Sequence, residues 1–147
     1  MPRTNSAPAR RIGPLLLVDD YEDARLCVRD ALENAGYQVV EATNGQQALH
    51  LLASAPVRYA LMVLDLQMPV MDGWQLLELL KRYFALSSLP VIIVTAHEPR
   101  LEQLQHPNIF GFIRAPYQAE ELLDMVDACL AGARRPLWTQ ASKGTAG

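Results

Sequence analysis

Three uninterrupted aliphatic runs constrain the fold of this chain, at residues 15–18, 61–64 and 91–94. Runs of this length are typical of strands buried on both faces, as in a parallel sheet covered by helices. Because the ligand crevice of such sheets lies beyond the carboxyl ends of the strands, residues that follow the runs should converge at one edge. The side chains of those residues all contain oxygen atoms, and the residues are Asp19, Asp20, Asp65 and Thr95. Three carboxylates and a hydroxyl suit a hard cation with oxygen ligands, and leave one carboxylate to react.

Strand-like and helical patterns alternate along residues 14–131, which we predict to form one α/β domain. Strands are expected at residues 15–18, 38–42, 60–64, 91–94 and 109–113. Helical patterns cover residues 22–35, 46–53, 74–84 and 119–130. Pro99 and Pro107 leave room for only about two helical turns between residues 97 and 108, so a shortened helix is predicted there. The alternation indicates a doubly wound, five-stranded parallel sheet.

The two ends of the chain differ from the middle in composition and charge. Residues 1–13 are predicted to be a disordered arm and residues 132–147 a flexible tail. Because six of the 13 bases lie in these ends, seven bases face all 16 acids in the middle, a net charge of −9. An acidic core of this kind is a poor surface for nucleic acid. No apolar run is long enough to span a membrane and no secretory signal is visible, so a cytoplasmic location is expected.

The cysteines and histidines do not form a recognisable metal site. Cys27 and Cys129 fall in separate helical patterns without a metal spacing, and they are expected to be small buried side chains. His50 and His106 share no ligand spacing with each other or with the acids, and they are expected at the surface.

Several short motifs, taken together, resemble the response regulator receiver domain, the fold of the chemotaxis response regulator. The motifs are Asp19-Asp20, Asn44-Gly45-x-x-Ala48-Leu49, Asp65, Met68-Pro69-x-Met71-Asp72-Gly73, Thr95-Ala96 and the run from Gly111 to Tyr117. Their joint order makes the match specific, and it covers residues 14–131. The resemblance implies a flavodoxin-like sheet with strand order 2-1-3-4-5 in three α/β/α layers.

The same resemblance implies a role for each acid. Asp65 would be the phosphoacceptor, whose carboxylate attacks a phosphohistidine of a histidine kinase or phosphotransfer protein. Asp19 and Asp20 would hold Mg²⁺ together with Asp65 and the backbone carbonyl of Gln67. A simpler reading has Asp19 and Asp20 cap the following helix, but this leaves Asp65 unexplained.

The residues after the fourth and fifth strands show one match and one departure. Thr95 would hydrogen-bond a phosphoryl oxygen, and Phe112 lies where the family places its switch aromatic. Ala115 stands where the family has Lys before the Pro that follows strand five. Arg114 or His97 could replace this cation, although neighbouring strand residues such as Arg114 and Ala115 point to opposite faces.

The resemblance therefore implies a stand-alone receiver in a two-component phosphorelay, which is not itself an enzyme. Its partners would be the phosphodonor and an unknown output protein, with no direct contact to nucleic acid or membrane. A pseudo-receiver that binds partners without regulated phosphorylation is the main alternative, and Ala115 favours it. An aspartyl-nucleophile phosphatase is a less favoured alternative, because that class places a second Asp where Gln67 stands here.

Overall fold

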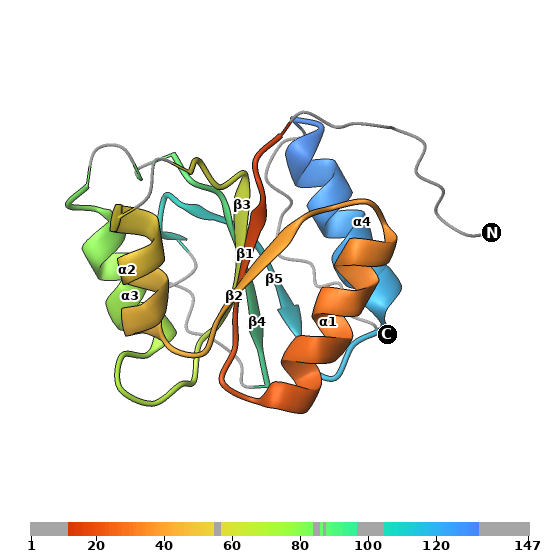
Figure 1. Ribbon diagram of the computed structural model, residues 1–147, viewed down its shortest axis with the longest axis horizontal. Coiled ribbons are helices and arrows are strands. Elements are labelled where there is room, and N and C mark those ends of the chain that lie inside the picture. Colours follow the sequence, from red (N-terminus) through yellow and green to blue (C-terminus); the bar gives the residue numbers. More distant parts are fainter. Residues whose placement is uncertain (1–11, 55–56, 84–85, 87, 97–104, 133–147) are drawn as a thin grey trace.

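The computed structural model describes residues 12–54, 57–83, 86, 88–96 and 105–132. Five parallel strands form one sheet in the order β2-β1-β3-β4-β5, which confirms the predicted fold (Figure 1). The strands are β1 (Leu15–Val18), β2 (Val39–Ala42), β3 (Leu61–Asp65), β4 (Val91–Thr95) and β5 (Ile109–Arg114). The helices are α1 (Glu22–Asn34), α2 (Gly45–Ser54), α3 (Gly73–Leu80) and α4 (Ala119–Leu130).

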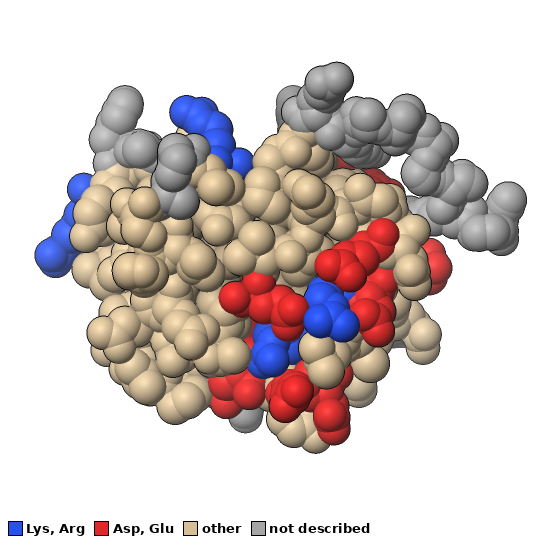
Figure 2. Space-filling view, in the orientation of Figure 1, with Lys and Arg blue, Asp and Glu red and all other residues tan. Residues whose placement is uncertain are grey.

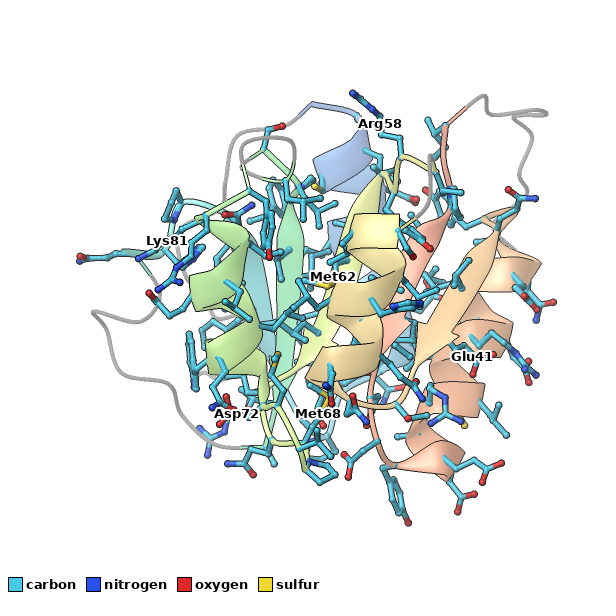
Figure 3. All side chains as sticks on the ribbon, turned by 60° about the vertical axis from the view of Figure 1, so that its left-hand side comes forward. Glu41, Arg58, Met62, Met68, Asp72 and Lys81 are labelled. Carbon is cyan, nitrogen blue, oxygen red and sulfur yellow. The ribbon has the colours of Figure 1, made fainter. Side chains whose placement is uncertain are left out.

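Helices cover both faces of the sheet, with α1 and α4 on one side and α2 and α3 on the other (Figure 1). Successive residues of β1 alternate between the two sides, because side chains along a strand have a period of two. Leu15 and Leu17 pack in the cluster on the α1 and α4 side, and Leu16 and Val18 pack on the α2 and α3 side. Met62 of β3 lies in the cluster on the α2 and α3 side (Figure 3). The two apolar layers explain why the strands read as continuous aliphatic runs.

Helix α3 begins and ends earlier than the sequence pattern indicates. Asp72 caps its first turn, because the Asp72 carboxylate accepts from the Gln75 amide at 2.9 Å. The Gln75 side-chain oxygen accepts in return from the Asp72 amide at 3.0 Å. After Leu80 the Arg82 and Tyr83 amides bond carbonyls three residues back, so the chain leaves the helix before the predicted end at residue 84.

Two predictions about polar side chains are wrong. His106 is buried, with 8% of its surface exposed. Its Nε2 lies 3.0 Å from the Leu77 carbonyl oxygen, and its Nδ1 accepts from the Asn108 amide at 3.1 Å. Cys27 is exposed rather than buried. A contact with another element accompanies the burial of His106, whereas the buried residues of α1 are Val28 and Leu32 rather than Cys27.

The remaining expectations for these residue types have mixed outcomes. Cys129 is half-buried, and its burial raises the pKa of its thiol to about 11, which keeps the thiol protonated. His50 is exposed, as predicted.

The short helix expected between residues 97 and 108 falls mostly outside the described residues, as do the predicted arm and tail. In the part of the chain that the structure describes, no helix combines the length and apolar character needed to cross a membrane.

Candidate metal and phosphoryl site

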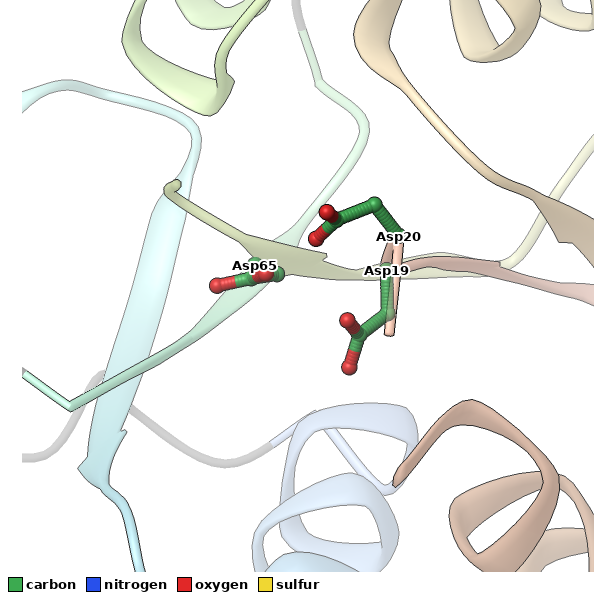
Figure 4. Close-up of side chains that lie close together, drawn as sticks. All are labelled: Asp19, Asp20 and Asp65. Atoms are coloured by element: carbon green, nitrogen blue, oxygen red, sulfur yellow. The ribbon is translucent and has the colours of Figure 1, made fainter. Parts of the chain in front are cut away.

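Three carboxylates meet at the carboxyl edge of the sheet. Strands β1 and β3 are neighbours, with Val18 paired to Leu64, so the residues that follow or end them lie side by side. Asp19, Asp20 and Asp65 each offer an oxygen atom, and these oxygens lie within 4.8 Å of one another (Figure 4). The predicted convergence is thus found for the three acids, which follow or end the two neighbouring strands β1 and β3.

The surrounding main chain orients two of these carboxylates. Asp19 Oδ1 accepts a hydrogen bond from the Tyr21 amide at 2.9 Å, and Asp65 Oδ1 accepts a longer one from the Gln67 amide at 3.3 Å. Helix α3 starts directly beside the site. A Cβ added to Gly73 would lie 2.8 Å from the Asp65 carbonyl oxygen, so this position requires glycine.

Among the described residues, the site carries excess negative charge that Arg25, on the Asp19 side, offsets only in part. Burial, and then the negative charge of Asp19, raise the pKa of Asp65 from 3.8 to about 7. Burial also raises the pKa of Asp19, to which the charge of Asp20 adds. Three carboxylates that cannot all ionise easily form a suitable site for a divalent cation, because the charge of the cation would offset their mutual repulsion.

The raised pKa of Asp65 predicts how stability depends on pH in metal-free protein. The folded state holds the proton up to about pH 7, whereas the unfolded chain releases it near 3.8, so stability falls as pH rises across this interval. Asp65→Asn removes this titration. We expect the variant to exceed wild type by roughly 1–2 kcal/mol at pH 8, a value discounted for solvent screening, and to match it near pH 4. Urea unfolding in EDTA measures both differences, and an equal gain at both pH values would contradict the explanation.

Thr95 and the end of β5 lie next to this cluster. Thr95 ends β4 with 2% of its surface exposed, and its carbonyl accepts from the Ala115 amide at 2.7 Å. Phe112 is half-buried and packs against the cluster on the α2 and α3 side. Ile113 packs on the α1 and α4 side, so alternation places Arg114 back on the face of Phe112.

The same alternation places Asp65 on the other face of the sheet. Leu64 packs on the α2 and α3 side, so Asp65 follows on the α1 and α4 side. Arg114 is exposed and lies across the sheet from it, which argues against Arg114 as a replacement for the missing Lys. His97, the other candidate, lies outside the described residues.

Comparison with known proteins agrees with this geometry. The family described as "Response regulator receiver domain" matches residues 15–127. The chain belongs to this family. It is 33% identical over 116 residues to sporulation initiation phosphotransferase F of Bacillus subtilis, a match that covers 76% of this chain and 89% of that protein.

Other relatives contain the receiver domain within larger proteins. The chain is 29% identical over 114 residues to the probable transcriptional regulator ycf29 of Porphyra purpurea, covering 76% of this chain and 54% of that protein. It therefore spans about half the length of this relative. Among solved structures, the signal receiver domain of a signal transduction histidine kinase from Syntrophus aciditrophicus has a TM-score of 0.73 and 29% identity. That match covers 88% of this chain and 99% of the solved chain.

Two residues of this receiver domain to which no role was assigned from the sequence lie close to the acids. Burial, and then the negative charges of Asp19 and Asp65, raise the pKa of Tyr117 to about 12, so its phenol remains an uncharged donor near the site. Arg25 of α1 donates from Nη1 to the Asp19 carbonyl oxygen at 3.0 Å. The position of Tyr117 directly after the Pro that follows β5 could have indicated from the sequence that Tyr117 lies near the site. For Arg25 the only signal was its spacing on the helix that follows Asp20.

The loop from β3 to α3 contains a strained residue. Val70 has a φ of 70°, a conformation that β-branched residues rarely adopt, and 70% of its surface is exposed. The strain costs on the order of 1 kcal/mol, and Asn tolerates this conformation far better. Val70→Asn should therefore stabilise the receiver domain by about 1 kcal/mol in urea unfolding. Val70→Thr is the matched control, since it keeps the branched side chain, and a similar gain in both variants would refute the strain argument.

Proposed function

We propose that Asp65 of this receiver domain accepts a phosphoryl group from a histidine kinase or a phosphotransfer protein. The observation that carries the proposal is the convergence of Asp19, Asp20 and Asp65 within 4.8 Å at the carboxyl edge of the sheet. An Asp65 carboxylate oxygen would bond to phosphorus as the phosphorus–nitrogen bond of the donor phosphohistidine breaks. The electron pair of the broken bond stays on the departing imidazole nitrogen.

The donor set fits Mg²⁺, which receiver domains generally bind at an acidic pocket. Asp19, Asp20 and Asp65 would hold the ion with the backbone carbonyl of Gln67. When bound, it would supply positive charge against the carboxylates and the incoming phosphoryl oxygens. Asp65 would then be ionised at neutral pH and able to attack, since a protonated carboxyl is a poor nucleophile.

Thr95 and Phe112 would act on the phosphorylated state. The Thr95 hydroxyl, at the end of β4, would donate a hydrogen bond to a phosphoryl oxygen. Phe112 is half-buried in β5, two residues before the strand ends, where a change of packing could reach the surface. We propose that the signal leaves by binding of an output protein. The match over 89% of sporulation initiation phosphotransferase F supports a second mode of output, delivery of the phosphoryl group onward to another protein.

The absence of Lys at Ala115 favours a second candidate, a pseudo-receiver that binds partners whatever its phosphorylation state. Against it stands the acidic site itself, because a site without function has no need to keep mutually repelling carboxylates. An aspartyl phosphatase is supported less well, since Gln67 occupies the place of its second acid.

The proposed function is tested by incubating the protein with acetyl phosphate, with and without Mg²⁺, and measuring intact mass. We expect one phosphate per chain, dependent on Mg²⁺, stable in acid and labile in base, as for an acyl phosphate. Absence of the modification with acetyl phosphate and with a panel of histidine kinases would leave the pseudo-receiver as the better description. Turnover of a generic phosphoester would instead indicate the phosphatase.

A further inference from the structure

Arg25 connects the turn that carries Asp19 to the edge strand of the sheet. Its Nη1 donates to the Asp19 carbonyl oxygen at 3.0 Å, and its Nε donates to Oε1 of Glu41 at 2.8 Å. Only 12% of the Arg25 side chain is exposed. Glu41 lies on β2 beside α1 (Figure 3). A single planar guanidinium therefore joins α1, β2 and the turn after β1, which a point charge cannot do with the same geometry.

Asp19 is consequently held at both its main-chain and side-chain ends. The Tyr21 amide fixes Oδ1 of the carboxylate at 2.9 Å, while Arg25 fixes the carbonyl oxygen of the same residue. Together these bonds restrict the backbone rotation that would swing the carboxylate away from Asp65. Loss of a group that orients a metal ligand commonly lowers the affinity for the metal by about 10–100-fold.

On the basis of the phosphoacceptor function above, we propose that Arg25, anchored by Glu41, is a positioning residue that holds Asp19 in the geometry required for divalent metal binding. Arg25 would be a ligand neither of the metal nor of the phosphoryl group. It acts through the Asp19 main chain, so its loss should first affect metal affinity and only then phosphorylation.

Electrostatics alone predicts that loss of Arg25 strengthens metal binding, whereas a positioning role predicts that it weakens metal binding. The two explanations can therefore be distinguished by experiment. Arg25 and Arg29 are bases set among acids over α1 and β2, where Figure 2 shows blue atoms surrounded by red. Removing a nearby positive charge should strengthen binding of a cation at an acidic site. Removing a positioning group should weaken it, in spite of the more negative surroundings.

Arg29 supplies the matched control. It lies one turn further along α1 and donates from Nη1 to the other Glu41 oxygen at 3.2 Å, and no hydrogen bond joins it to Asp19. Arg25→Gln and Arg29→Gln therefore remove the same charge from the same helix face, and only the first releases Asp19. Arg25→Lys keeps the charge but can reach only one of the two acceptors.

The experiment titrates Mg²⁺ into each variant of the 147-residue chain and follows the amide resonance of Tyr21, whose N–H bonds Asp19. We expect Arg25→Gln to bind Mg²⁺ about tenfold more weakly, Arg25→Lys to be intermediate, and Arg29→Gln to match wild type or bind slightly more tightly. The Tyr21 amide of metal-free Arg25→Gln should also shift, which a general loss of stability would not cause. Adding Glu41→Gln to Arg25→Gln should weaken Mg²⁺ binding no further, because the guanidinium that Glu41 anchors is already absent.

Equal or tighter Mg²⁺ binding by Arg25→Gln would overturn the inference and leave the proposed function intact. Equal weakening by Arg29→Gln would also overturn it, since the effect would then follow from charge or helix stability. If Arg25→Gln does not fold, Arg25→Lys decides, and wild-type affinity in that variant counts against the inference. Mg²⁺ binding without phosphorylation in wild type would refute the phosphoacceptor function alone, whereas absence of Mg²⁺ binding in wild type would refute both.

Discussion

Asp65→Asn should abolish covalent phosphate incorporation, with a fall of at least about 10³-fold in labelling rate. The substitution keeps the shape of the side chain but replaces the attacking carboxylate by an amide that is a very poor nucleophile. Folding should be preserved, because removing one of three clustered negative charges relieves repulsion. Acetyl phosphate labelling with Mg²⁺, followed by intact mass and by peptide mapping, measures the effect.

Asp72→Asn is the matched control for this experiment. Asp72 precedes α3 and accepts from the Gln75 amide as a helix cap, a role that Asn fills well. The control removes the same charge from a neighbouring loop, and we expect normal labelling. Label that persists in Asp65→Asn, or that maps to Asp72, would show that another residue is the acceptor.

Ala115→Lys should produce the second large effect, a gain of about 10²–10³ in the rate of labelling. A cation beside developing phosphoryl charge is comparable to an oxyanion donor, whose loss costs this much. Ala115 directly follows β5, is half-buried, and its amide bonds the carbonyl of Thr95. A Lys side chain from this position would start next to the site. The rate of acetyl phosphate labelling with Mg²⁺ is the measurement.

Ala115→Met separates the charge from the length of the new side chain, and we expect it to label like wild type. If Ala115→Lys has no effect while Arg114→Ala abolishes labelling, Arg114 supplies the cation. Its position on the opposite face of the sheet from Asp65 would then not prevent it from reaching the site. If wild type does not label and Ala115→Lys restores nothing, the pseudo-receiver description applies.

The sheet and the three acids were predictable because both depend on local runs of the sequence. A strand buried on two faces needs apolar residues at every position, as in β1, and this pattern needs no knowledge of distant contacts. Strand ends then place Asp19 and Asp65 at one edge, since parallel strands all point the same way. Helix α4 was predicted at residues 119–130, and it spans Ala119–Leu130.

Two of the failures involve residues whose hydrogen-bond partners lie elsewhere in the chain, and one involves the orientation of a single helix position. His106 is buried because the carbonyl of Leu77, 29 residues away, accepts from its ring. Cys27 was expected to be buried within a helical pattern, but Val28 and Leu32 are the residues of α1 that are buried. One position along a helix is a rotation of about 100°, which moves a side chain from core to solvent. Arg25 was overlooked since its anchor, Glu41, lies 16 residues further on.

The site is assembled from three strands that are adjacent in space and distant along the chain. Asp19, Asp65 and Thr95 come together only when β1, β3 and β4 are all paired. A divalent ion held here would therefore bind the complete sheet and not a partly folded chain, and its binding energy would be added to the stability of the whole domain. Chemical competence and cooperative folding would then be linked, so a chain that has not finished folding could neither take up the ion nor respond to the phosphodonor.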